Sequence, residues 1–292
     1  MFDVTTDVYG LDLELFDTEV LAAYVVDAEE PVLVETGYPL AIDRLRDGLA
    51  DAGVEPRDLQ HAVVSHVHVD HSGGAAFLAG DNPDLSVYLH ESTVDHLVDP
   101  AGLTESSRDA MGEHFAEMGE SAPVPESNVV AVGDSHTIDV GDRSLELVST
   151  PGHSPDHISA WDPASGTLFA NEAPGSYYPK AGQWLPPATL PRFDVEAVRD
   201  STARLREFDA DRLALSHFGV QSDPGTALDS ALDALATFEE RIPELYEEYR
   251  DLAGTERAVR EELVVLDGYS EDIRAFEARF QTRGFLSYLG LL

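Results

Sequence analysis

Cysteine is absent from this chain of 292 residues, so disulfide bonds, thiolate metal sites and cysteine nucleophiles are excluded. Basic residues are scarce: there are 18 lysines and arginines, with Lys180 the single lysine, against 56 aspartates and glutamates, and the net charge is −38. Such a chain lacks the basic surface that nucleic acids and anionic membranes require. No run approaches the roughly 20 apolar residues of a membrane-spanning helix. We therefore expect a small-molecule substrate, with no nucleic-acid or membrane partner.

The acidic residues are spread along the chain and alternate with regularly spaced apolar residues, which make up 43% of it. A disordered acidic protein would lack that apolar periodicity. The pattern is similar to that of proteins from extreme halophiles, because at 1 M salt the Debye length of about 3 Å removes most self-repulsion. We expect folding to require high salt. The N-terminus has no basic region followed by an apolar segment, so we expect a cytoplasmic protein.

The segment from His66 to His71 concentrates potential metal ligands. It follows an apolar run at 62–64 that is typical of a buried strand, and glycines follow it at a turn. If the extended geometry persists, His66, His68 and Asp70 project to one face, and His71 projects to a neighbouring point. Imidazole and carboxylate groups are the usual ligands of zinc and related ions. Four donors in six residues could supply parts of two adjacent metal sites.

Three distant segments offer further ligands, each just after a strand-like run. His153 follows the run at 145–148, Glu172 follows that at 168–170, and His217 follows that at 213–215. Any one of them alone is a weak signal. Together they repeat one arrangement, in which a strand delivers a donor group to its end.

These motifs resemble those of the metallo-β-lactamase superfamily of metal-dependent hydrolases over about residues 15–220. The carriers are Ser-His-Val-His-Val-Asp-His-Ser-Gly-Gly at 65–74, Thr-Pro-Gly-His-Ser at 150–154, the strand ending at Glu172, and Ser-His-Phe-Gly at 216–219. The resemblance implies a four-layer αββα sandwich of the α/β class. It also implies a first metal bound by His66, His68 and His153, a second bound by Asp70, His71 and His217, and a carboxylate between the two.

Two positions depart from the family's pattern. The bridging residue, normally Asp, is Glu172 here, and its extra methylene leaves three placements open: bridging both metals, binding one, or pointing away. Glu35 replaces the Asp of a family strand that usually reads Ile-Asp-Thr-Gly. We expect Glu35 to support the site by orienting a ligand histidine, without binding metal itself.

Apolar spacing predicts the remaining elements. Strands are expected over 20–28, 31–35, 61–65, 85–90, 128–132, 136–140, 143–149, 157–161, 167–170 and 212–215, and helices over 40–49 and 195–208. Residues 99–127 are a polar insertion with a helical middle at 106–118. A plain surface excursion and a lid near the substrate are both open readings.

A helical extension follows the catalytic domain, so we divide the chain into residues 1–220 and 221–292. Asp223-Pro224 is a helix start, and further helices are predicted over 256–266 and 270–283, the last ending at Gly284. The apolar C-terminus is expected to pack against the main domain, with a homodimer contact as the alternative.

The resemblance implies a hydrolase of the glyoxalase II or lactonase kind, acting on a small ester, thioester or lactone with one or two zinc ions; iron or manganese are alternatives. Asp70 is the candidate catalytic residue as well as a ligand, and Tyr177 and Tyr178 are candidates for binding substrate at the developing oxyanion. Two alternatives remain open: a mononuclear iron oxygenase similar to persulfide dioxygenases, and a non-catalytic metal-stabilised protein. A flavodiiron role is disfavoured, because that group carries Glu where His68 stands.

Overall fold

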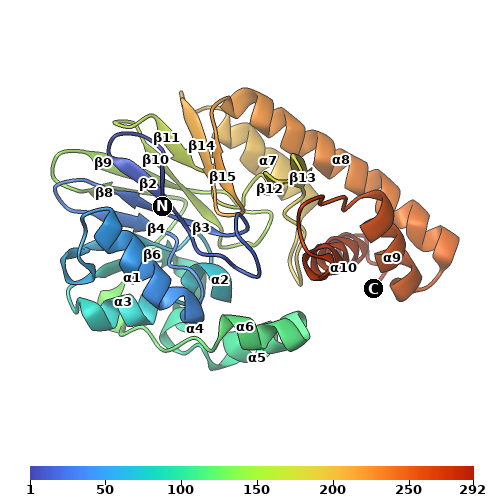
Figure 1. Cartoon of the computed structure of the whole chain (residues 1–292), viewed down its shortest axis with the longest axis horizontal. Helices are drawn as coiled ribbons and strands as arrows, with labels where there is room; N and C mark the ends of the chain where they lie inside the picture. Colours follow the sequence, from blue (N-terminus) through green and yellow to red (C-terminus); the bar gives the residue numbers. More distant parts are fainter.

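Two β-sheets face each other at the centre of the molecule, and helices cover the outer face of each (Figure 1). The computed structural model describes residues 1–292. The first sheet has seven strands in chain order: β1 (Phe2–Asp3), β2 (Val8–Asp12), β3 (Ala22–Val26), β4 (Val32–Val34), β5 (His61–Val63), β6 (Ser86–His90) and β7 (Val129–Val132). The pairs from β1 to β4 are antiparallel, and those from β4 to β7 are parallel.

The second sheet has six strands in the order β15-β14-β11-β10-β9-β8. Their bounds are β8 (Ser135–Asp139), β9 (Ser144–Ser149), β10 (Ile158–Asp162), β11 (Thr167–Phe169), β14 (Arg212–Leu215) and β15 (Gly219–Gln221). A small hairpin, β12 (Ser176–Tyr178) and β13 (Gln183–Leu185), lies outside both sheets. The sequence predicted neither this hairpin nor β1, β2 and β15, because these strands are short or interrupted by polar residues.

Ten α-helices complete the fold. They are α1 (Ile42–Asp51), α2 (Val69–Ser72), α3 (Ala75–Asp81), α4 (Val94–Val98), α5 (Ala101–Met111), α6 (Phe115–Met118), α7 (Val195–Leu205), α8 (Pro224–Tyr249), α9 (Leu252–Glu262) and α10 (Glu271–Tyr288). None combines the length and apolar character that crossing a bilayer requires.

Three apolar clusters correspond to the contacts between the layers. In β3, Tyr24 packs between the two sheets, whereas its neighbour Val25 packs on the helical side with Leu45 of α1. This alternation follows from the two-residue period of a strand. On the second sheet, Leu213 of β14 packs outward with Leu205 of α7. The predicted αββα sandwich is therefore confirmed.

The strands of both sheets deliver polar residues to one edge. Strands β4 and β5 run parallel, as do β11 and β14, so the carboxyl ends of each pair lie side by side. Glu35 follows β4, and His66 comes three residues after β5. Glu172 and His217 follow β11 and β14 in the same way. The architecture thus gathers residues that are far apart in the sequence.

The C-terminal segment forms α8, α9 and α10, which pack beside the sandwich (Figure 1). Asp223 caps α8 by accepting a hydrogen bond from the Thr226 backbone N–H, as the sequence predicted. The predicted end of the last helix was wrong, because α10 continues through Gly284 to Tyr288. A Cβ at Gly284 would lie 3.0 Å from backbone atoms of Thr189, so this glycine permits close packing instead of ending the helix.

The apolar C-terminus is buried in part. Phe285 and Leu286 are fully buried and belong to the same apolar cluster as Leu45 of the main domain. Leu291 and Leu292, the last two residues, are exposed. The extension and the sandwich therefore share one apolar core.

Candidate metal centre

A tight turn after β5 carries the first ligands. The strand ends at Val63, and His66 and His68 lie in a bend, while Asp70 and His71 lie in the short helix α2. The expectation that an extended strand aligns His66, His68 and Asp70 was therefore wrong. The close turn depends on Gly74, since a Cβ there would lie 2.0 Å from a backbone oxygen.

Three imidazoles converge in a first group of ligands. The Nδ1 atom of His68 lies 2.9 Å from Nε2 of His66 and 3.0 Å from Nε2 of His153. His153 donates its Nδ1 proton to the Pro187 carbonyl oxygen at 3.0 Å, which leaves the lone pair on Nε2. This group contains the three residues expected for a first metal.

A second group consists of Asp70, His71 and His217. The Oδ2 atom of Asp70 lies 3.4 Å from Nε2 of His71 and 3.5 Å from Nε2 of His217. His217 donates its Nδ1 proton to the Val20 carbonyl oxygen at 2.8 Å, so its Nε2 lone pair faces the group. These are the residues expected for a second metal.

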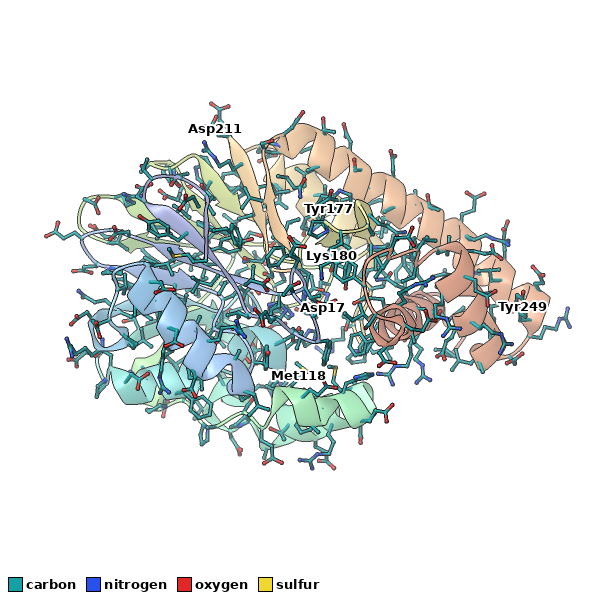
Figure 2. The ribbon with its side chains drawn as sticks, viewed as in Figure 1. Asp17, Met118, Tyr177, Lys180, Asp211 and Tyr249 are labelled. Atoms are coloured by element: carbon teal, nitrogen blue, oxygen red, sulfur yellow. The ribbon has the colours of Figure 1, made fainter.

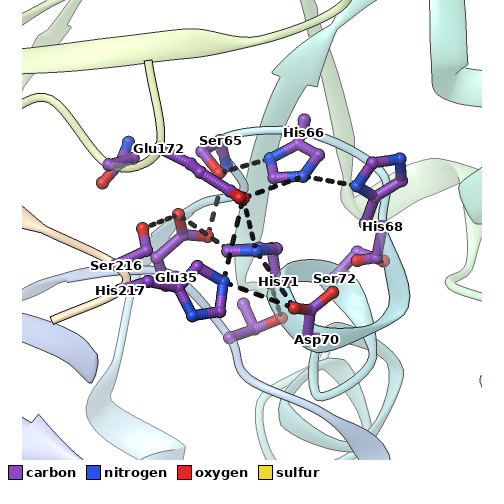
Figure 3. A network of polar contacts seen from close by, with 12 residues as sticks. Glu35, Ser65, His66, His68, Asp70, His71, Ser72, Glu172, Ser216 and His217 are labelled. Atoms are coloured by element: carbon purple, nitrogen blue, oxygen red, sulfur yellow. Dashed lines mark hydrogen bonds and ion pairs between the residues drawn. The ribbon is translucent and has the colours of Figure 1, made fainter. Parts of the chain in front are cut away.

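Glu172 lies between the two groups (Figure 3). Its Oε2 atom is 3.3 Å from Nε2 of His71 and 3.3 Å from Nε2 of His153. The same oxygen is 3.8 Å from Nε2 of both His66 and His217. Of the three placements left open by the sequence, the carboxylate occupies the one that faces both groups.

The distances between these atoms, and the absence of hydrogen bonds at His71, fit a divalent metal. Ligand atoms of a tetrahedral zinc, each about 2.0–2.1 Å from the ion, lie about 3.3–3.4 Å apart. The contacts of Glu172 with His71 and His153, and that of Asp70 with His71, match this spacing. The three ligand atoms of each group lie within 4.8 Å of one another. His71 adds an independent sign, because it is fully buried and neither ring nitrogen makes a hydrogen bond.

The electrostatics of the first group favour neutral imidazoles. Burial, reinforced by the neighbouring His71 and His68, holds the pKa of His66 well below its ordinary value. Burial also lowers the pKa of His153 to about 3, although Glu172 opposes the effect. Neutral imidazole is the form that binds a metal.

The second group instead favours a positive charge at its centre. Burial would raise the pKa of Asp70, but His71 and His217 hold it well below its ordinary value. Burial would lower the pKa of His71, but Asp70 and Glu35 raise it well above its ordinary value. The carboxylates therefore favour a cation here, a role that a metal ion would fill in place of the proton.

Glu35 contacts His71 at Nδ1, the ring nitrogen that faces away from Asp70 and Glu172. Its carboxylate is fully buried, lies 3.2 Å from Nδ1 of His71, and accepts a hydrogen bond from Ser216 Oγ at 2.7 Å. Because it touches the ring nitrogen opposite the metal-facing one, it is placed to orient His71, in keeping with the supporting role inferred from the sequence.

Two further residues hold the ligand loops. Asp156 accepts hydrogen bonds from the Val67 N–H at 2.9 Å and from Thr93 Oγ1 at 3.1 Å, which anchors the turn between His66 and His68. His157 accepts a hydrogen bond from the Glu172 N–H at 3.2 Å. Asp156 was missed from the sequence, although it lies three residues after His153.

A cavity of about 610 Å³ opens beside these ligands. Its walls come from the turn after β5, from α5 in the insertion, from residues 186–192 and from α10. Tyr178 and Glu277 both line it, and the Tyr178 hydroxyl donates a hydrogen bond to Glu277 Oε1 at 2.7 Å. His96 also lines this cavity.

Two residues near the centre have other partners (Figure 2). Tyr177 is not part of the cavity wall and packs against Trp184 in a tilted arrangement, with ring centroids 5.3 Å apart. Tyr177 therefore does not face this cavity, and its role in binding substrate stays a prediction. Lys180 forms an ion pair with Asp17 at 3.1 Å, so its charge is already matched.

A family model described as the metallo-beta-lactamase superfamily matches residues 17–217. The chain belongs to this superfamily. ST1585, a metallo-beta-lactamase fold-containing protein from Sulfurisphaera tokodaii, is 24% identical over 214 residues, which cover 70% of this chain and 75% of that protein. The crystal structure of ST1585 aligns with a TM-score of 0.71 at 18% identity over 98% of this chain and 99% of that one. The likeness to the fold of ST1585 thus extends over the C-terminal helices.

Other relatives within the superfamily are matched over shorter regions. The acyl-coenzyme A thioesterase MBLAC2 from Gallus gallus is 30% identical over 161 residues, which cover 50% of this chain and 52% of that protein. MJ0732 from Methanocaldococcus jannaschii is 25% identical over 175 residues, which cover 60% of this chain and 36% of that protein. The chain thus spans about half the length of MBLAC2 and about a third of the length of MJ0732.

Proposed function

We propose that the protein is a metal-dependent hydrolase that cleaves small ester, thioester or lactone substrates. The observation that carries the proposal is the position of Glu172 Oε2, 3.3 Å from His71 of one ligand group and 3.3 Å from His153 of the other. The names of two relatives add support: an acyl-coenzyme A thioesterase from Gallus gallus and an N-acyl homoserine lactonase from a Bacillus species.

The proposed ligands form two sets around this carboxylate. One set is His66, His68 and His153, and the other is Asp70, His71 and His217, with Glu172 shared. A bound divalent ion supplies a water ligand of lowered pKa and polarises a carbonyl oxygen. We propose zinc as that ion, since imidazole and carboxylate donors at tetrahedral spacing suit it.

The chain's own residues have distinct parts in the reaction. Asp70 stays ionised because His71 and His217 keep its pKa low, so it can accept a hydrogen bond from the attacking water and orient it. Tyr178 and Glu277 present a hydrogen-bonded pair to the cavity, and this pair is the polar contact that we propose for the substrate. Apolar side chains such as Leu103 and Phe276 in the same wall exclude water from the bound ester.

The test is a substrate panel with the metal-loaded protein in molar salt. We expect turnover of thioesters or lactones with zinc or manganese, and loss of both metal and turnover in His68→Ala and His71→Ala. His136→Ala is the matched control, because His136 lies on β8, does not line the cavity and belongs to neither ligand group, so this variant should keep full activity. Variants that lose the metal but hydrolyse at the original rate would exclude this function.

One observation favours a second candidate, a mononuclear iron oxygenase. His66, His71 and Glu172 form a group of two imidazoles and one carboxylate, the donor set typical of non-haem iron. A solved structure described as the peroxy diiron species of a chemotaxis sensor aligns with a TM-score of 0.53 over 80% of this chain, which is consistent with iron in this fold. Elemental analysis separates the candidates: one iron per chain with oxygen consumption and no ester hydrolysis would support the oxygenase.

A further inference from the structure

A second cavity of about 380 Å³ adjoins the first and is walled in part by arginines. The two cavities lie side by side, because they share five wall residues: Ser106, Ala110, Leu190, Pro191 and Phe280. Most of these shared side chains are apolar. A substrate that reaches from the metal ligands into the second cavity would therefore cross these shared, mostly apolar side chains, which we call the neck.

Arg279 and Arg283 lie one helical turn apart on α10 and both line the second cavity. Arg283 pairs with Glu256 at 2.7 Å. Arg279 forms no ion pair, although acids outnumber bases by 56 to 18, and its hydrogen bond within the chain is to the Ala110 carbonyl oxygen at 2.6 Å. Its guanidinium lies over the Phe280 ring at 5.2 Å.

Partial burial of the Arg279 guanidinium without an ion pair costs free energy, and a bound anion would offset that cost. Burial lowers the pKa of Arg279, and the like charge of Arg283 adds to that effect. The one carboxylate in the wall, Asp109, is exposed and forms no ion pair with either arginine. A guanidinium has five N–H donors in a planar fork, of which Arg279 uses one within the chain, and this fork matches phosphate and carboxylate oxygens.

We propose that the second cavity binds the anionic group of an elongated thioester substrate, a phosphate or carboxylate on its leaving group, through Arg279 and Arg283. The inference rests on the proposed function, which places the substrate carbonyl at the metal ligands of the first cavity. The uncharged middle of the substrate then lies in the neck against Phe280 and Leu190.

Three thioesters of one acyl group test the inference: the coenzyme A thioester, with phosphates; the glutathione thioester, with carboxylates; and the uncharged N-acetylcysteamine thioester. The measured quantity is the ratio of kcat/KM for a charged substrate to that for the uncharged one, at one fixed salt concentration. We expect Arg279→Met to lower this ratio by tenfold or more, as loss of a charged hydrogen bond does. If the ratio falls for the coenzyme A thioester, the bound anion is a phosphate. If it falls for the glutathione thioester, the bound anion is a carboxylate.

Controls separate binding from folding. Arg279→Lys keeps the charge without the fork, so it should restore part of the ratio, and Arg283→Met should lower the ratio without touching the bond to Ala110. Arg257→Met is the matched control, because Arg257 is exposed, forms no ion pair and lines neither cavity. An unchanged ratio in both Arg279→Met and Arg283→Met would overturn the inference.

A binding measurement distinguishes failure of the subsite from failure of the proposed function. If no thioester is hydrolysed, titration calorimetry with free coenzyme A and free glutathione measures the subsite directly. Binding to the parent protein that is lost in Arg279→Met would support the subsite while excluding thioesters as the hydrolysed substrates. Absence of binding by both compounds would overturn the subsite.

Discussion

Replacing Glu172 by glutamine tests whether one carboxylate serves both groups of ligands. The substitution keeps the length of the side chain and removes its charge. Since Oε2 lies 3.3 Å from ligand atoms of His71 and His153, both groups lose the same anionic donor at once. The companion change Glu172→Asp keeps the charge but withdraws the carboxylate by roughly 1.5 Å, the length of one carbon–carbon bond.

The expected loss of metal affinity can be estimated from residues that hydrogen-bond to metal ligands without binding the metal themselves. Their removal lowers metal affinity by about 10- to 100-fold. A donor that binds the metal itself should cost at least the upper value, so we expect the weaker of two ions to bind at least about 100-fold less tightly, or about 2.7 kcal/mol. Glu172→Asp should show a similar loss, because the shortened side chain no longer spans both 3.3 Å contacts.

The assay is elemental analysis after equilibrium dialysis against a series of zinc buffers, with parent and variants side by side. Glu30→Gln is the matched control: Glu30 also contacts a histidine, His61, at 2.9 Å, but lies apart from the ligand groups, so its metal content should not change. If Glu172→Gln binds its ions with the affinity of the parent, the bridging role is wrong.

Three further predictions concern the stability of the fold. Tyr24→Phe removes a buried hydroxyl that lies 2.6 Å from the Leu215 carbonyl oxygen and 3.0 Å from that of Gly219, so denaturant unfolding should show a loss of about 1–3 kcal/mol; an unchanged midpoint would contradict this. Burial would raise the pKa of Asp7, but hydrogen bonds from Thr5 and Arg143 lower it below its ordinary value, so its ionised form stabilises the fold above about pH 4. Asp7→Asn should therefore destabilise the protein at pH 6, and the difference from the parent should shrink as the pH falls below 4; a difference independent of pH would count against the ion pair. Finally, with a net charge of −38, thermal melting followed by circular dichroism should show the melting temperature falling steeply as salt is lowered from 2 M to 0.1 M, and a constant value would refute the halophilic interpretation.

The local motifs were sufficient to predict the candidate ligands, but not the backbone that carries them. Counting donors in the segment 66–71 indicated two metal sites, and the structure brings those donors into two groups. The argument from strand periodicity failed because the chain leaves the strand at Val63 and enters α2 at Val69. Ligand chemistry depends on the side chain, whereas local direction depends on glycines such as Gly74, whose close contact with residue 36 a sequence does not display.

Residues that line the cavity were the hardest to predict. Tyr177 and Tyr178 are neighbours with the same side chain, yet only Tyr178 lines the cavity, because adjacent positions of a strand face opposite sides. Glu277 and Arg279 lie about 100 residues further along the chain, in a segment for which the sequence analysis considered packing or a dimer contact but no place in the site. Nothing in their own segment indicates that α10 faces α5.

The sequence alone determined which chemical groups are available: six imidazole and carboxylate donors plus one glutamate, no thiols, and enough periodic apolar residues for a buried core. The tertiary structure decided which of them meet. His68 and His153 are 85 positions apart and Glu35 and Ser216 are 181 apart, yet each pair is within 3.0 Å. Such distances depend on how two sheets pack through their apolar faces, which is a property of the whole core and not of any one segment.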